Sequence, residues 1–176
     1  MKDLKSKLKD YLDNNLSKDN QSKKELFKTK NLFVEEYYDL AFENENTFYK
    51  TNTNIKDFIN KHEEYNDFQT MLFKFIDNKK LKDSDVYNKV HIDRRLFSKI
   101  RSDKNYHPSK ETIILLGIAL ELTENELDDL LESASYSLPK NNEYDLIIRF
   151  CFINKIFKIT SINELLYEYN CKLFNY

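Results

Sequence analysis

The chain has 176 residues, of which 40% are hydrophobic and 33% are charged, and its net charge is −2. This length accommodates one ordinary domain, or a small domain with a helical extension. The single glycine and two prolines are too few for the turns of an all-β protein of this size, so we expect an all-α fold.

The first residues, MKDLKSKLKDYL, are charged throughout, and no window of the chain approaches the ~18 consecutive apolar residues of a membrane span. We therefore predict a cytoplasmic protein that does not enter a membrane. Cys151 and Cys171 do not belong to a Cys-x-x-Cys pair, and His62, His91 and His107 are scattered. These patterns predict buried structural thiols, and neither a metal site, a cofactor nor a catalytic group.

Two amphipathic helices are expected within residues 1–66. Leu4, Leu8 and Leu12 recur at every fourth position, which predicts a helix that ends near the first Asn-Asn pair. Residues 26–43 carry apolar side chains at helical spacing, between polar segments that are typical of linkers. This helical extension is compatible with three arrangements: a dimerising helical hairpin, packing on the following domain, or partial mobility.

The clearest hydrophobic pattern lies in residues 67–138, which we predict to be one helical domain. Apolar residues at positions i, i+3, i+4, i+7 and i+8 from Phe68 predict a first helix. A second helix is expected at residues 84–90, with Asp83 or Ser84 as its N-cap. A third helix, capped by Asp93, is expected at residues 94–101.

Two more helices of this domain are expected after the loop that ends at Pro108. Ser109 is the N-cap of the segment SKETIILLGIALEL, and Thr123 forms a capping box with Glu126 at the start of TENELDDLLESA. Gly117 lies inside the first of these two helices. We interpret it as a small residue that lets the helix pass close to a neighbour.

Residues 139–176 are predicted to form a C-terminal helical cap. The segment from 144 to 157 is apolar on nearly every side, which favours a buried helix over a strand. Ser161 and Glu164 have the spacing of a capping box before a last helix. The β-branched residues at 156–160 leave a short strand as an alternative.

Positive charge is concentrated in residues 79–110, which contain ten Lys or Arg and four Asp. Residues 111–145 contain nine acidic residues and one lysine. A basic segment beside an acidic one can present one face to a polyanion. Since Phe97 and Ile100 point inward from the predicted third helix, its outward face carries Arg94, Arg95, Ser98 and Lys99.

These outward residues have the chemistry that reads base edges in the DNA major groove. Arginine binds O6 and N7 of guanine with two hydrogen bonds, which discriminates bases by roughly 1–3 kcal/mol. On the flanking loops, Lys104, His107 and Lys110 are expected to contact phosphates, a salt-sensitive contribution that does not depend on sequence.

The stretch from residue 82 to residue 127, KDSDVYNKVHIDRRLFSKIRSDKNYHPSKETIILLGIALELTENEL, resembles the helix-turn-helix of the phage-repressor (Xre-type) DNA-binding family. Together with the tail YDLIIRF…INELLYEYN, it also resembles a divergent, poorly characterised bacterial variant of that family, which implies the fold without an established activity. The family resemblance implies a repressor-like helix-turn-helix core, a double-stranded DNA partner, and a homodimer that regulates transcription.

Three positions depart from the pattern of this family. Tyr87 stands where a small residue, commonly alanine, lets the two helices approach each other. His91 stands at a turn position that is usually glycine because its φ is often positive. Asp83 stands near a glutamine that contacts phosphate, and an acid there repels the DNA backbone. These departures support an alternative, a protein-interaction module that regulates or inhibits another protein without binding DNA.

Overall fold

The computed structural model describes residues 3–16 and 67–175. Within these two stretches it contains eight helices and no strand, which confirms the expected all-α fold class. None of the described helices is both long and apolar enough to cross a lipid bilayer. The predicted amphipathic helix at residues 26–43 lies outside the described residues, as do the polar segments around it.

The chain divides into two units by its internal contacts. The first unit combines residues 1–13 with residues 66–176, and the second contains residues 14–65. Helices α3–α9 and most of the N-terminal helix (residues 3–16) belong to the first unit. The start of the chain therefore groups with the C-terminal part, and not with the residues that directly follow it.

Three short helices open the C-terminal part: α3 (Phe68–Asn78), α4 (Asp83–Lys89) and α5 (Arg94–Ser102). Helix α5 begins where the sequence predicts, because the carboxylate of Asp93 accepts a 2.6 Å hydrogen bond from an N–H of its first turn. Helix α4 begins earlier than expected. Its N-cap is Lys82, and Asp83 and Ser84, which we expected at that position, lie within the helix.

The next two helices are α6 (Lys110–Ala119) and α7 (Glu124–Glu132). The Oγ of Ser109 accepts a 3.2 Å hydrogen bond from the N–H of Thr112, as predicted for the N-cap of α6. At the start of α7, the N–H of Glu126 donates to Thr123 Oγ1 at 3.3 Å, and the N–H of Thr123 donates to the Glu126 carboxylate at 2.7 Å. The predicted capping box is therefore confirmed.

The last two helices are α8 (Glu143–Ile153) and α9 (Ile159–Glu168). The predicted capping box at Ser161 is wrong, since this serine lies inside the first turn of α9 and the N-cap is Lys158. The possible strand at residues 156–160 is not formed either. Ile159 and Ile162 are both buried, so the helix starts early enough to place both on its inner face.

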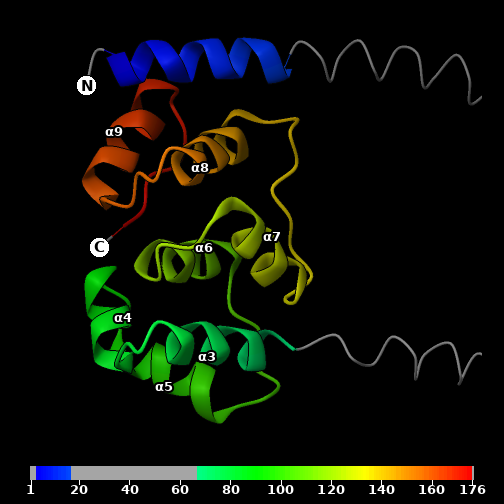
Figure 1. The fold of residues 1–176 in the computed structure, drawn as a ribbon, viewed down its shortest axis with the longest axis vertical. Coiled ribbons are helices and arrows are strands. Elements are labelled where there is room, and N and C mark those ends of the chain that lie inside the picture. Colours follow the sequence, from blue (N-terminus) through cyan, green and yellow to red (C-terminus); the bar gives the residue numbers. More distant parts are fainter. Residues whose placement is uncertain (1–2, 17–66, 176) are drawn as a thin grey trace, which may run out of the picture. The chain divides into compact units, whose positions relative to one another are not determined.

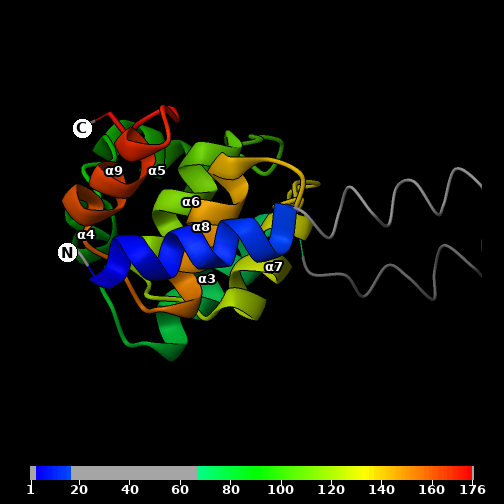
Figure 2. The same ribbon diagram turned by 90° about the horizontal axis from the view of Figure 1, so that it is seen from above.

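Figure 1 shows α6 and α7 between the pair α8–α9 on one side and helices α3–α5 on the other. The N-terminal helix runs along α8 and α9 in both ribbon views (Figure 1, Figure 2). Two of its three regularly spaced leucines, Leu8 and Leu12, are buried, which agrees with the predicted apolar face. The ring of Tyr11 lies 5.5 Å from that of Phe150 on α8, so the helix packs on the core through side chains.

Gly117 allows α6 to approach both α7 and α8 closely. A Cβ atom at this position would lie 2.8 Å from Cδ1 of Leu127 and 3.3 Å from Cζ of Phe152. Real Cβ atoms essentially never come as close as the first distance, so a larger residue requires the side chain of Leu127 to move. This confirms the expected role of the glycine.

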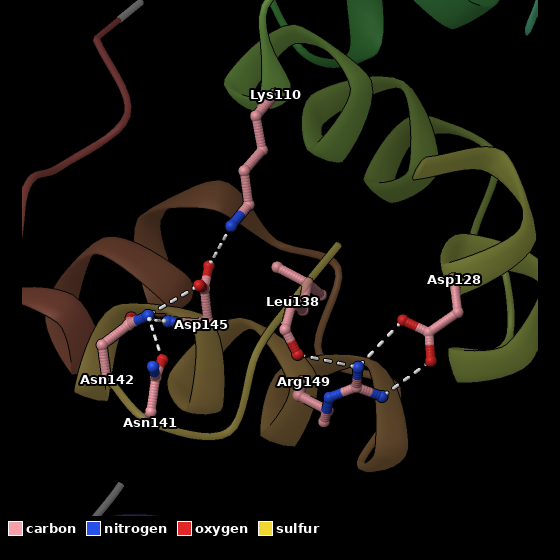
Figure 3. Close-up of polar contacts among 7 residues, drawn as sticks. All are labelled: Lys110, Asp128, Leu138, Asn141, Asn142, Asp145 and Arg149. Atoms are coloured by element: carbon pink, nitrogen blue, oxygen red, sulfur yellow. Dashed lines mark hydrogen bonds and ion pairs between the residues drawn. The ribbon is translucent and has the colours of Figure 1, made fainter. Parts of the chain in front are cut away.

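Helix α8 carries two buried charges that tie it to α6 and α7 (Figure 3). Asp145 is 3% exposed, and its carboxylate accepts a 2.6 Å hydrogen bond from Nζ of Lys110 and a 2.7 Å hydrogen bond from Nδ2 of Asn142. Arg149 binds Asp128 on α7 and donates to the carbonyl oxygen of Leu138 at 3.0 Å. A charge in a core is tolerated when it is paired and hydrogen-bonded. Both charges are paired here, and among the described residues the buried side-chain atom left without a hydrogen-bond partner is Nε of Arg149.

Candidate nucleic-acid interface

Helices α4 and α5 pack against each other through a shared apolar face. Four apolar residues are each at most 2% exposed: Val86 of α4, its C-cap Val90, and Phe97 and Ile100 of α5. The ring of Tyr87, half-buried, lies 5.5 Å from the ring of Phe97. A large aromatic side chain is therefore accommodated at the position where a small residue was expected.

The turn between the two helices is tight and contains a left-handed residue. His91 has a φ of 55°, the positive value expected at this position. The N–H of Ile92 donates to the carbonyl oxygen of Tyr87 at 2.9 Å, which closes the end of α4 in the manner of a Schellman motif. A histidine in this conformation costs roughly 1–2 kcal/mol relative to a right-handed one, a cost that the packing of the pair has to offset.

One side of α5 faces solvent and carries the four residues predicted to read bases. Successive residues are about 100° apart around a helix, so these four share one side, opposite Phe97 and Ile100. Arg94, Arg95 and Ser98 are exposed, and neither arginine side chain has an ion-pair or hydrogen-bond partner within residues 3–16 and 67–175. Lys99 is also exposed, with its Nζ 4.5 Å from the centroid of the Tyr106 ring.

The acid at position 83, expected to repel a phosphate backbone, is paired with a cation. An oxygen of the Asp83 carboxylate lies 2.5 Å from a terminal nitrogen of Arg101. The same guanidinium lies over the ring of Phe73, 3.9 Å from its centroid. The ion pair neutralises Asp83 locally, and the ring of α3 holds the guanidinium in place.

A shallow hollow of about 370 Å³ lies between α4 and α5. Arg94 and Ser98 line it from α5, while Tyr87 and Phe97 supply its apolar part. The hollow is also lined by two cations, one acid and a serine: Lys82, Arg101, Asp83 and Ser84.

Sequence reasoning missed three polar members of this hollow: Lys82, Ser84 and Arg101. A signal for Arg101 was present, because Arg94, Ser98 and Arg101 follow the i, i+4, i+7 spacing of one helix side. Lys82, the N-cap of α4, and Ser84, in its first turn, had no such signal, since the N-cap of that helix was expected at Asp83 or Ser84.

The residues predicted to contact phosphate do not gather at one place. Lys104 and His107 line a second hollow, of about 170 Å³, together with residues from the start of α3 and the end of α7. The His107 ring packs against Tyr136, with their centroids 5.2 Å apart. Lys110 lines neither hollow, because its ammonium group is bound to the buried carboxylate of Asp145.

The arrangement at α4 and α5 offers cations and hydroxyl groups around a shallow apolar floor, which suits binding of an anionic surface. In the described part of the chain, no three His, Cys, Asp or Glu side chains come together in a way that could hold a metal ion. The chain matches no known protein family, no curated protein and no solved structure.

Proposed function

We propose that the protein is a sequence-specific double-stranded DNA-binding regulator of transcription. Helices α4 and α5 act as a helix-turn-helix pair, and α5 enters the major groove, which is wide enough to admit a helix. The observation that carries this proposal is the solvent-facing side of α5, where Arg94 and Arg95 are exposed and make no ion pair within the described residues.

The four residues on this side have separate roles. Arg94 and Arg95 read guanine edges, and Ser98 and Lys99 contact neighbouring bases or their phosphates. The ring of Tyr106 beside Lys99 Nζ restricts where that ammonium group can reach.

Phosphate contacts come from residues that line the two hollows. Lys82 and Ser84, at the start of α4, contact phosphates where this helix crosses the DNA backbone; both line the hollow between α4 and α5. Lys104 and His107 provide a second contact. We assign none to Lys110, because moving it to a phosphate would leave the buried carboxylate of Asp145 without its cation.

The protein acts as a homodimer in this proposal. A dimer places two α5 helices in successive major grooves, about 34–36 Å apart on one side of the duplex. The expected binding site is therefore a pseudo-palindrome. Sedimentation of the protein with and without such a duplex measures the stoichiometry directly.

The test is selection from a pool of randomised duplexes with the full chain, followed by a salt series on the enriched sequence. We expect one enriched motif, and an affinity that falls log-linearly with salt. Replacement of both Arg94 and Arg95 by alanine is expected to abolish the sequence preference. The matched control, Lys9→Ala with Lys140→Ala, removes the same charge from exposed positions outside α4 and α5 and is expected to keep it.

Two results count against this proposal. The first is that the Arg94→Ala, Arg95→Ala variant still selects the same motif. The second is that the folded protein retains no duplex even at low salt. The second result favours the alternative, in which the chain is a protein-interaction module. The next experiment is then a search for a partner protein that stays bound to it at high salt.

A further inference from the structure

A cavity of about 710 Å³ opens where the end of α4, the turn between α6 and α7, and the turn between α8 and α9 meet. Lys89 and His91 line it from the first of these and Glu121 from the second. Residues 155–158 line it from the third, and Ile159 and Thr160 from the start of α9. Its volume lies within the ~300–1,000 Å³ typical of small-molecule sites. None of the four outward residues of α5 lines it, so it is distinct from the proposed DNA-binding side.

The acid in the wall of this cavity is already paired. Nζ of Lys89 lies 2.5 Å from the Glu121 carboxylate. That hydrogen bond, reinforced by the lysine charge, lowers the pKa of Glu121 and keeps it ionised. Because Lys89 and Glu121 neutralise each other, the net charge of the cavity wall is set by its other two lysines.

Those two lysines, Lys155 and Lys158, are exposed, and their ammonium groups have no ion-pair or hydrogen-bond partner in the described part of the chain. They lie on the turn between α8 and α9 and are three positions apart. The charge of the cavity wall is therefore positive, and two ammonium groups are available for a ligand with negatively charged oxygens.

The start of α9 adds hydrogen-bond donors to the same wall. Lys158 is the N-cap of α9 and makes no side-chain capping bond, so the first-turn N–H groups have no side-chain acceptor. Ile159 and Thr160, in the first helical turn of α9, line the cavity. Helix N-terminal N–H groups favour anions, and the residues that carry them line the same cavity as both lysines.

Part of the cavity wall is apolar. Ile156 and Phe157 are half-buried, and Ile159 is only 8% exposed. The ring of Phe157 is held by an edge-to-face contact with Phe152, with their centroids 5.6 Å apart. A cavity with cations at one part of its wall and a fixed aromatic ring at another suits a ligand that has an anionic group attached to an apolar body.

We propose that this cavity binds a small phosphorylated ligand with an aromatic body, of the nucleoside monophosphate class. Lys155 and Lys158 hold the phosphate, and Ile156 and Phe157 contact the base or an equivalent ring.

The test is calorimetric titration of the full chain with adenosine 5′-monophosphate, with adenosine and inorganic phosphate as partial ligands. We expect the monophosphate to bind more tightly than either partial ligand. Replacing both lysines, Lys155→Gln with Lys158→Gln, is expected to weaken it about tenfold or more, because two charge-assisted contacts are lost. The control Lys9→Gln with Lys140→Gln, equal in charge, is expected to bind as the unchanged protein does.

A third variant separates the two parts of the ligand. Phe157→Leu is expected to bind inorganic phosphate unchanged and to lose most of the preference for the monophosphate. The proposal is overturned if the monophosphate gives no binding at millimolar concentration, or if the lysine variant, folded by circular dichroism, binds it as well as the control. No DNA is present in these titrations, so their outcome does not depend on the proposed function.

Discussion

The guanidinium of Arg149 binds the carboxylate of Asp128 through both terminal nitrogens, at 2.8 and 2.9 Å. It also donates to Glu124 at 2.6 Å, so one buried cation on α8 joins two acids on α7. Burial lowers the pKa of this guanidinium, but the hydrogen bonds that it donates to Asp128 and Glu124, together with their negative charges, outweigh this effect and raise the pKa. The side chain is 11% exposed and stays charged, which makes it a fixed link between the two helices.

Replacement of Arg149 by methionine is expected to lower the free energy of unfolding by about 1–3 kcal/mol, less than for a fully buried pair because both acids are partly exposed. Urea denaturation followed by circular dichroism measures the change. Lys140→Met removes an exposed cation and serves as the control. Equal unfolding midpoints for the two variants would show that the link contributes nothing to stability.

Gly117→Ala is expected to destabilise the protein by about 1–3 kcal/mol through the contact with Leu127, although alanine is the better helix former by about 1 kcal/mol. Leu127→Val removes the Cδ1 atom that the new methyl group would meet. The double variant is therefore expected to lose less stability than the two single changes added together. Strict additivity in this double-mutant cycle would mean that the close contact is not what excludes a side chain.

The starts of α5, α6 and α7 could be predicted because Asp93, Ser109 and Thr123 each cap the helix that follows them. The start of α9 could not. Ser161 and Glu164 have the spacing of a capping box, yet the helix begins before them because Ile159 and Ile162 are buried together. Local capping is worth about 1 kcal/mol, and burial of two isoleucines outweighs it.

At the candidate site, the exposure of Arg94 and Arg95 followed from helical spacing alone, since the apolar residues beside them occupy the opposite side. The binding of Lys110 to Asp145 could not be predicted from helical spacing, because it joins positions 35 apart in the chain. A signal was present all the same. Two charges four residues apart, Asp145 and Arg149, lie within the apolar stretch of this helix, and buried charges of this kind need partners from elsewhere in the fold.

The two cysteines are expected to differ in reactivity. Cys151 is fully buried, and this burial raises the pKa of its thiol to about 12, whereas Cys171 is half-buried. A thiol-exchange reagent at neutral pH should therefore modify one thiol of the native protein, and both in denaturant. In Cys171→Ser the native protein should not react on the same time scale. Rapid modification of that variant would place Cys151 within reach of solvent.

Under the proposed function, the contacts of Lys104 and Arg95 with DNA differ in kind. Lys104→Gln is expected to weaken binding to all duplexes alike and to reduce the slope of log affinity against log salt by about 1. Arg95→Gln is expected to relax the preference at one base pair, at a cost of about 1–3 kcal/mol on the enriched sequence. Fluorescence anisotropy with matched and mismatched duplexes separates the two effects. If Arg95→Gln weakened binding to every duplex equally, Arg95 would be assigned to phosphate contacts and not to base contacts.

Leu8→Ala tests the packing of the N-terminal helix on the core. The side chain is fully buried, so its truncation is expected to lower the free energy of unfolding by about 2–4 kcal/mol. Lys9→Ala, at the neighbouring exposed position, is expected to change it by less than about 0.5 kcal/mol. Equal stability of the two variants, measured by urea denaturation, would show that the helix does not contribute to the folded core.

The contact between Tyr11 and Phe150 has a further consequence for how the molecule is made. The partners are 139 positions apart, so the N-terminal helix leaves the ribosome long before the surface of α8 that receives it has been synthesised. A lone helix of this length is marginal in water, and its apolar side has to remain uncovered in the meantime. Folding of this unit is therefore completed late and through a contact of high sequence separation, which is slow to form. For the same reason, a fragment that starts at α3 would leave Phe150 without its aromatic neighbour and is expected to aggregate more readily than the full chain.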